Sequence, residues 1–166
     1  MFPFLFSLLA IPITLILSLW RRYRGESLKT MFICVTYFMV SLSFLLITVH
    51  IRHNAFVGLA QRSRQLVVAI HQFERKYGKP PNNLSQLVPE FLPSVPKTGM
   101  GAYPEYEYYL SSNPNEFEGN SWILEVDTPN GGINFDKFMY FPKQNYPEVG
   151  YGGVIERIED WAYVHE

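Results

Sequence analysis

The sequence has little charge and a single cysteine, and each shortage excludes a class of protein. Asp, Glu, Lys and Arg make up 17% of the 166 residues, and the formal net charge is −1. From Met31 onward there are 14 acidic and 10 basic residues, a balance that disfavours binding to nucleic acid. The one cysteine, Cys34, cannot form a disulfide within the chain.

The sequence also lacks the short motifs of common enzyme classes. It contains no G-x-S-x-G, H-E-x-x-H, Walker or G-x-G-x-x-G pattern. Cys34 lies inside an apolar run, which gives it no case as a nucleophile. His165 could form an acid–base pair with Glu156 or Asp160, but almost any two titratable groups allow such a pairing. A membrane enzyme is therefore the least favoured interpretation.

Two long segments contain no charged residue. They are Met1–Trp20 and Met31–Val49, separated by the basic segment RRYRGESLKT. At about 1.5 Å of rise per residue, a helix of either length approaches the ~30 Å hydrocarbon core of a bilayer. A secretory signal peptide carries basic residues before its apolar core, whereas here the arginines follow it. We expect an uncleaved transmembrane hairpin within the lipid bilayer, with the link at residues 21–30 in the cytoplasm.

Residues 31–77 contain no proline and only one glycine, Gly58, so the second apolar helix is expected to continue beyond the membrane. Past His50, apolar residues recur at helical spacing on one face. They are Ala55, Leu59, Leu66, Ile70, Phe73 and Tyr77. Gly78 marks the expected end of the helix. The second transmembrane helix and an amphipathic spine are thus expected to form one element over residues 31–77.

The remaining chain, residues 78–166, predicts a short helix followed by an antiparallel sheet. A helix of one or two turns, capped by Asn82 or Asn83, is expected before Pro89. Later segments are rich in aromatic and β-branched residues and are separated by turn-forming residues. They are residues 106–110, 122–127, 137–141 and 154–164.

The expected fold class is α+β, with three parts in chain order. Residues 1–30 form the first transmembrane helix and the basic link, and residues 31–77 form the second transmembrane helix and the spine. Residues 78–166 form an extracytoplasmic α+β region with a small antiparallel sheet that packs on residues 55–77.

Residues 66–101 resemble one region of a known family. They read LVVAIHQFERKYGKPPNNLSQLVPEFLPSVPKTGMG, in which a helix leads to a Y-G-x-x-P turn and then to L-x-x-L-V-P-x-F-L-P-x-x-P. The matching positions are Tyr77, Gly78, Pro81, Leu84, Leu87, Val88, Pro89, Phe91, Leu92, Pro93 and Pro96. This pattern resembles the segment after the spine helix in type II secretion pseudopilins and related type IV pilin-like proteins. The resemblance implies a pilin-like domain at a bacterial inner membrane, in contact with other envelope proteins.

The resemblance covers the globular region and not the processing signal of that family. Pilins and pseudopilins carry a cleavage glycine followed by a Phe-Thr-x-x-x-Glu-like start of the apolar helix. The nearest counterpart here is Gly25, followed by ESLKTMF, and it does not match. An additional apolar run precedes it, so the sequence does not predict prepilin processing or assembly into a fibre.

Asp127, Asn130 and Asp136 flank a Pro-Asn-Gly-Gly turn and form the candidate metal site. Oxygen ligands on a loop are what calcium prefers. The resemblance adds support, because some major pseudopilins bind calcium in their β-region. The alternative is an ordinary hairpin turn with solvated carboxylates, since the spacing is not of the D-x-D-x-D-G type.

Two histidines near the end of the second apolar run allow a further metal hypothesis. His50 and His53 lie three residues apart, within reach of one ion or of lipid headgroups. A structural or catalytic zinc site normally uses three or four protein ligands, and no third candidate stands nearby in the sequence. Polar residues at the membrane surface are the favoured interpretation.

We therefore expect a non-enzymatic, membrane-anchored interaction module or accessory subunit of an envelope or secretion-type complex. Its partners would be the lipid bilayer and other envelope membrane proteins. The alternative is a ligand- or calcium-sensing module at the membrane surface, acting through the loop between Asp127 and Asp136.

Overall fold

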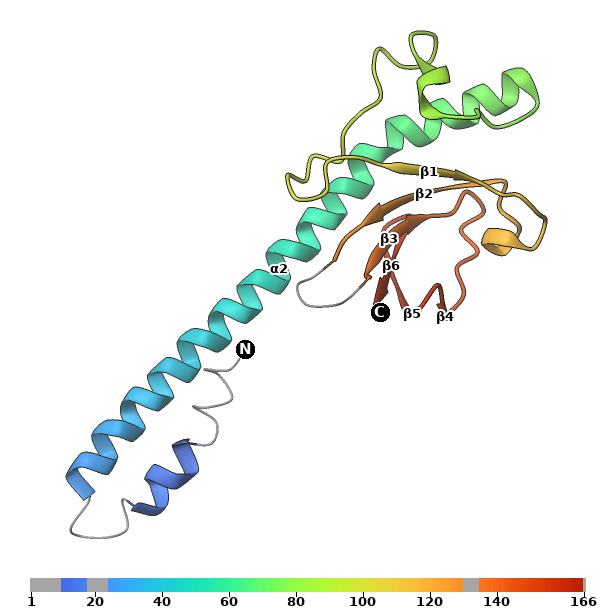
Figure 1. Ribbon diagram of the computed structural model, residues 1–166. Helices are drawn as coiled ribbons and strands as arrows, with labels where there is room; N and C mark the ends of the chain where they lie inside the picture. Colours follow the sequence, from blue (N-terminus) through green and yellow to red (C-terminus); the bar gives the residue numbers. More distant parts are fainter. Residues whose placement is uncertain (1–9, 18–23, 130–134, 166) are drawn as a thin grey trace. The chain divides into compact units, whose positions relative to one another are not determined.

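The computed structural model describes residues 10–17, 24–129 and 135–165 (Figure 1). The chain divides into two compact units, Met1–His53 and Asn54–Glu166. The fold is α+β, as expected: one long helix that is apolar in its N-terminal part leads into a curled antiparallel sheet.

The long helix α2 comprises 54 residues, Arg24–Tyr77. The prediction of an unbroken helix over residues 31–77 is confirmed, and the helix begins earlier, inside the segment expected to be a link. It ends where glycine allows a left-handed backbone: Gly78 has φ +72°, and its N–H donates to the Glu74 carbonyl oxygen at 2.8 Å.

The first apolar run is described only at residues 10–17, which are helical. The rest of the predicted first transmembrane helix lies at residues 1–9 and 18–23, outside the described residues. Within the described part of the chain, a second helix long enough to cross a membrane is not present.

Six strands form one antiparallel sheet in the order β1-β2-β3-β6-β5-β4. Their bounds are β1 Glu107–Leu110, β2 Trp122–Asp127, β3 Lys137–Tyr140, β4 Val149–Gly150, β5 Gly153–Ile158 and β6 Trp161–His165. Two short 3₁₀ helices, η1 Leu84–Leu87 and η2 Glu116–Gly119, lie in the connections. Strand β6 is central, because it pairs with β3 on one side and with β5 on the other.

The predicted strands at residues 106–110, 122–127 and 137–141 correspond to β1, β2 and β3. The single strand predicted at residues 154–164 is wrong, because the chain reverses there and forms the β5–β6 hairpin. Glu159 takes a left-handed backbone with φ +55° at the reversal. The two-residue strand β4 was not predicted, since its length gives no alternation to detect.

The main core of residues 54–166 lies between α2 and one face of the sheet. Three residues of the predicted apolar helix face, Leu59, Leu66 and Ile70, have 0% exposure, which confirms that face. Tyr77 differs, being 47% exposed at the end of the helix. The sheet contributes large aromatic side chains to the same cluster, among them Trp122, Phe138, Trp161 and Tyr163.

Both buried tryptophans also hydrogen-bond to the helix. The Trp161 Nε1–H donates to Ser63 Oγ at 2.9 Å, and the Trp122 Nε1–H donates to Glu74 Oε1 at 3.0 Å. An indole N–H removed from water needs such an acceptor. Because Ser63 and Glu74 lie at different positions along α2, these two bonds also prevent the helix from sliding along the sheet.

The opposite face of the sheet is partly covered by the connections. Ile123, Met139, Phe141 and Val164 form a second buried cluster there, contacted by Phe117, Tyr146, Tyr151 and Ile155. The Tyr146 hydroxyl accepts from the Phe141 backbone N–H and donates to the Asp160 carbonyl oxygen, both at 2.8 Å. The sheet is therefore buried on both faces over β3 and β6, the two strands at its centre.

The short helix predicted after Gly78 is present as η1, but its predicted capping is wrong. Asn83 occupies the N-cap position without a side-chain hydrogen bond to the helix. The side chain of Gln86 instead folds back over the start of the helix, and its Oε1 accepts from the Asn82 backbone N–H at 2.8 Å. Leu87 is fully buried and anchors this segment to the core.

One buried hydroxyl predicts a stabilising substitution. Among the described residues, the Tyr106 hydroxyl is the one buried side-chain polar atom with no hydrogen-bond partner, so Tyr106→Phe removes an unsatisfied group. We expect it to stabilise the fold by roughly 1 kcal/mol, whereas the control Tyr146→Phe, which removes a satisfied hydroxyl, should destabilise it by about 1–3 kcal/mol. Denaturant titration of both variants measures the difference, and equal losses would contradict it.

Ionisation of Tyr106 should also destabilise the fold at alkaline pH. Burial raises the pKa of Tyr106 from 10.0 to about 12, so the folded protein holds a phenolic proton that the unfolded chain releases. The stability linked to this proton is present below pH 10.0 and is lost as the pH rises through about 12. The loss of stability over this range should be shallower in Tyr106→Phe than in the unsubstituted protein.

Candidate functional site

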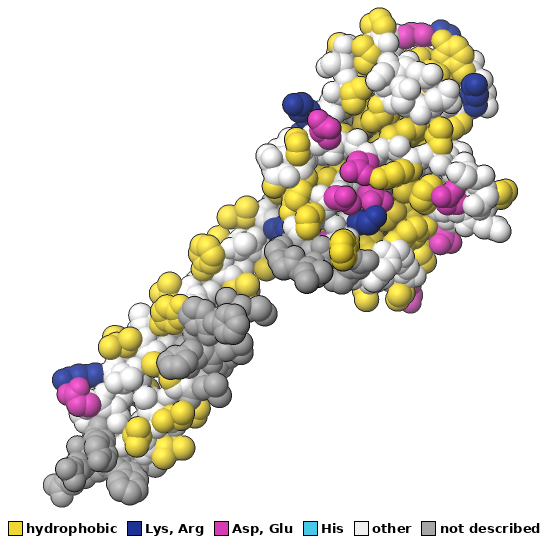
Figure 2. All heavy atoms as spheres, in the orientation of Figure 1, with side chains coloured by type: hydrophobic (Ala, Val, Ile, Leu, Met, Phe, Trp, Pro, Cys, Tyr) yellow, Lys and Arg dark blue, Asp and Glu magenta, His cyan; other side chains and the backbone are white. Residues whose placement is uncertain are grey.

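The N-terminal part of α2 presents an extensive apolar surface. The helical segment Gly25–Tyr77 contains an 18-residue window of mean hydropathy 2.3, none of it buried, and is long and apolar enough to cross a membrane. Its exposed apolar side chains are Leu28, Phe32, Ile33, Val35, Tyr37, Met39, Val40, Phe44, Leu45, Leu46, Ile47, Val49 and Ile51. Figure 2 shows the hydrophobic side chains along this helix after its charged first turn. Water is a poor solvent for so large an apolar surface.

One narrow face of the same helix is less exposed than the rest. Ser27 is buried, and Met31, Cys34, Phe38 and Ser41 are half-buried. Their spacing of four, three, four and three residues places them on one side of a helix. This side is therefore covered within the unit Met1–His53, whereas the remaining circumference is open.

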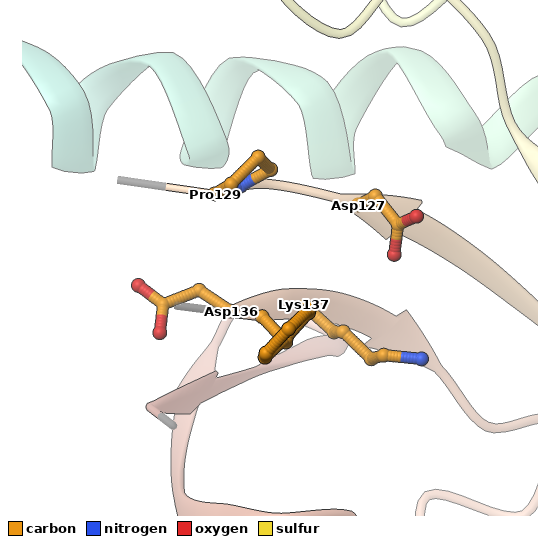
Figure 3. Close-up of a pocket in the computed structure, with 5 residues that line it drawn as sticks. Asp127, Pro129, Asp136 and Lys137 are labelled. Atoms are coloured by element: carbon orange, nitrogen blue, oxygen red, sulfur yellow. The ribbon is translucent and has the colours of Figure 1, made fainter. Parts of the chain in front are cut away.

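The candidate calcium residues lie where β2 ends and β3 begins. A hollow of about 200 Å³ is lined by Asp127, Pro129, Phe135, Asp136 and Lys137. Asp127 pairs with Lys137 across the two strands, so both side chains lie on one face of the sheet, and Asp136 lies on the other face. Figure 3 shows the Asp136 carboxylate directed away from Asp127, with the Lys137 side chain extending beneath Asp127.

Asp136 also has a structural role. Its Oδ2 atom accepts a hydrogen bond from the Tyr163 hydroxyl at 2.5 Å, and its side chain is buried. Its carbonyl oxygen accepts from the Thr128 backbone N–H at 2.9 Å, which closes the end of the β2–β3 ladder. The third candidate, Asn130, lies outside the described residues. Within residues 10–17, 24–129 and 135–165, no group of three or more His, Cys, Asp or Glu side chains is arranged to hold a metal ion.

Calcium binding by Asp127, Asn130 and Asp136 stays a prediction with a direct test. A bound ion stabilises the folded state in proportion to the logarithm of its concentration. If the site binds calcium, the melting temperature should rise in millimolar calcium, fall to its starting value with chelator, and respond less in Asp127→Asn. An unchanged melting temperature in calcium and in chelator would exclude the site.

The Lys137 ammonium group lies among carboxylates on the outer face of the sheet. Its Nζ donates to Glu125 Oε1 at 2.7 Å, and Glu107 lies directly opposite Glu125 on β1. Burial raises the pKa of Glu125, and the ammonium of Lys137 opposes that rise. The hydrogen bond to Glu125 in turn raises the pKa of Lys137. Lys137 therefore neutralises part of this cluster, to which Asp127 also belongs.

The charges of the folded unit are divided between its layers. Residues 54–97, which form the spine and the segment after it, carry 6 basic and 2 acidic residues. Residues 98–166, which contain the whole sheet, carry 3 basic and 12 acidic residues. The face in Figure 2 shows Asp and Glu side chains gathered over the strands. The total of 14 acidic and 10 basic residues from Met31 onward hides this division, which appears only when the two layers are counted separately.

The histidines that the sequence singled out are dispersed. His165 Nε2 lies 2.9 Å from Glu156 Oε2, and both side chains are about half exposed, at 51% and 54%. Asp160, the other proposed partner, lies at the β5–β6 reversal and uses its carbonyl oxygen to bind Tyr146. His50 and His53 lie on α2, in the other unit.

Sequence reasoning missed the carboxylate of Glu74, which joins the helix to the sheet. Glu74 Oε2 lies 3.0 Å from His71 Nδ1, while Oε1 accepts from Trp122. The His71 and Trp122 rings meet edge to face at 5.5 Å between centroids. The sequence shows only a glutamate in a charged helical stretch, because its partner is 48 residues away in the chain.

Comparison with protein-family models, curated proteins and solved structures found no match to this chain. The functional assignment therefore depends on the surfaces and contacts described above.

Proposed function

We propose that the protein is a non-enzymatic membrane protein whose apolar helix anchors an extracytoplasmic interaction module. The anchor is the part of α2 from Leu28 to Ile51, and the module is the unit Asn54–Glu166. The observation that carries the proposal is the contrast between the two. The module buries most of its large apolar side chains, whereas the anchor exposes apolar side chains in nearly every direction.

The bilayer is the environment that makes this contrast favourable. Each Leu, Ile, Phe or Val near the centre of a membrane helix favours insertion by roughly 0.3–0.6 kcal/mol. The helix also satisfies its own backbone hydrogen bonds, as a segment in lipid must. A soluble partner would have to wrap around most of the helix to hide the same side chains, because they are not confined to one stripe.

Basic residues give the proposed orientation. The segment RRYRGESLKT, residues 21–30, contains four basic residues and one acidic residue and lies at the N-terminal end of the anchor, overlapping its first three residues. Short loops rich in Lys and Arg stay in the cytoplasm. The module would then face the opposite side, with residues 1–20 returning through the membrane as the first helix of a hairpin.

A pseudopilin-like role is part of this proposal. The order of a membrane helix, an amphipathic spine, a Pro-rich segment and an antiparallel sheet supports it, together with the motif at residues 66–101. Because the segment after Gly25 does not match a prepilin cleavage site, we propose a permanently anchored accessory subunit that contacts other proteins of a bacterial envelope complex. Fold alone does not specify the partner.

Reporter fusions test the anchor and its orientation. One reporter is placed after Glu166 and a second within residues 21–30 of the full chain. We expect the C-terminal reporter to be active only outside the cytoplasm and the link reporter only inside it. A cytoplasmic C-terminal reporter would contradict the proposed location of the module. Crosslinking in intact cells then tests for an envelope partner, and recovery of the protein alone would contradict the accessory role.

A further inference from the structure

The side chain of Arg62 is held in one place by the segment that follows the spine. Its Nε–H donates to the Thr98 carbonyl oxygen at 2.7 Å, although the two residues are 36 positions apart. Within the described residues this is the one hydrogen bond that the guanidinium group makes. The two terminal nitrogens, Nη1 and Nη2, therefore remain available on a side chain whose orientation is already set.

Two glycines make room for this arginine. A Cβ atom at Gly58, one helical turn before Arg62, would lie 2.9 Å from Nη1. At Gly99, which has φ +77°, a Cβ atom would lie 2.4 Å from Nε. Glycine inside a helix costs roughly 0.5–1 kcal/mol relative to alanine. The guanidinium group of Arg62 fills the space that a side chain at residue 58 would occupy, which explains why glycine stands there despite this cost.

The guanidinium group lies at the edge of an open hollow of about 490 Å³. The hollow is lined by Gly58, Gln61, Arg62, Gln65, Pro96 and Lys97. The helix residues follow the spacing of a single helix face, and Pro96 and Lys97 come from the segment that crosses it. Gln61, Gln65 and Lys97 are exposed, and their side chains make no hydrogen bond to the described residues.

The charge of the hollow is positive and uncompensated. No carboxylate lines it. The two acidic residues of the layer 54–97 are occupied further along α2: Glu74 binds Trp122, and Glu90 binds Lys76 and Tyr77. Two cationic groups and two amide groups thus line one hollow without a protein acceptor for Lys97 or for the Arg62 Nη atoms.

We propose that this hollow binds a phosphate group, with Arg62 and Lys97 supplying the charge and Gln61 and Gln65 supplying amide donors. A planar guanidinium group binds two oxygens of such a group at once, while an ammonium group acts as a compact charge beside it. The tetrahedral phosphate offers enough acceptors for all four side chains. The phosphate could belong to a soluble metabolite or to a phospholipid headgroup. All residues that line the hollow belong to the unit Asn54–Glu166, so the proposal does not rest on the membrane anchor.

Binding is tested on the full chain in a neutral detergent at constant ionic strength. Inorganic phosphate and, separately, short-chain phosphatidylglycerol are titrated, and heat or thermal shift reports binding. The test variant is Lys97→Ala, because Lys97 is exposed and its loss leaves the Arg62–Thr98 bond intact. The matched control is Lys79→Ala, an exposed lysine that does not line the hollow.

We expect Lys97→Ala to weaken binding about tenfold, as the loss of one charge-assisted hydrogen bond should, and Lys79→Ala to leave it unchanged. This pattern with inorganic phosphate assigns the site to a soluble ligand. The same pattern with phosphatidylglycerol alone assigns it to a lipid headgroup. Absence of binding to both probes, or equal effects of the two lysine variants, overturns the proposal.

Discussion

Trp161→Ala should destabilise the folded unit by about 3–5 kcal/mol, the usual cost of removing a large buried aromatic side chain. Trp161 has 0% exposure, and its ring stacks on Phe138 at 4.9 Å between centroids. Its strand, β6, is the one that joins the two halves of the sheet. A loss of this size is a large fraction of the total stability of a small domain. Circular dichroism during denaturant titration measures it.

Trp161→Phe separates packing from hydrogen bonding at this position. Phenylalanine keeps much of the ring surface and loses only the donor to Ser63. The Ser63 hydroxyl also donates to the Ala60 carbonyl oxygen at 2.7 Å, so it stays satisfied without the indole. We therefore expect Trp161→Phe to cost clearly less than Trp161→Ala. If both variants lost less than about 1 kcal/mol, the packing of α2 on the sheet described above would be wrong, because truncating a fully buried tryptophan costs more than that.

Val40→Lys and Val68→Lys should differ strongly, although both replace an exposed valine on the same helix. Val40 is 63% exposed in the proposed anchor, and Val68 is 49% exposed in the folded module. Lysine near the centre of a membrane helix costs about 2.5–3.5 kcal/mol in insertion assays, whereas an exposed substitution in water usually stays within ±0.5 kcal/mol. We expect Val40→Lys to shift the insertion equilibrium by about a hundredfold.

The measurement is the fraction of full-length protein that resists extraction from membranes, with insertion free energy read from a glycosylation-mapping assay. Val68→Lys serves as the control for the chemistry of the substitution. Equal insertion of the two variants would show that the exposed apolar surface of α2 is not in lipid. In that case the membrane anchor would be excluded, while the phosphate site could still be tested as described.

The parts of the fold that the sequence predicted are those coded by local patterns. The absence of proline from residues 31–77 and the glycine at 78 predicted the helix and its end. The buried face of the spine followed from the spacing of Leu59, Leu66 and Ile70. Strand β2 agrees in both bounds, because WILEVD is a compact run of strand-forming residues between strong turn signals.

The parts that were missed depend on partners distant in the sequence. The reversal at Glu159 and Asp160 interrupts a run that otherwise has strand-like composition. Glu-Asp is not one of the dipeptides typical of two-residue hairpin loops. The setting of Arg62 requires Gly99 and Thr98, which a helix pattern cannot indicate. Likewise, the opposite faces of Asp127 and Asp136 follow from the register of β2 and β3, whereas their spacing in the sequence suggested convergence.

Strand β6 lies in the middle of the sheet but is the last of its six strands to be synthesised. Strands β1, β2 and β3 emerge first, but the inner edge of β3 stays unpaired until residues 161–165 have been made. An unpaired edge of this kind invites pairing with another chain. The module therefore stays open to such pairing until β6 is available, and its tendency to aggregate should fall once β6 has paired with β3.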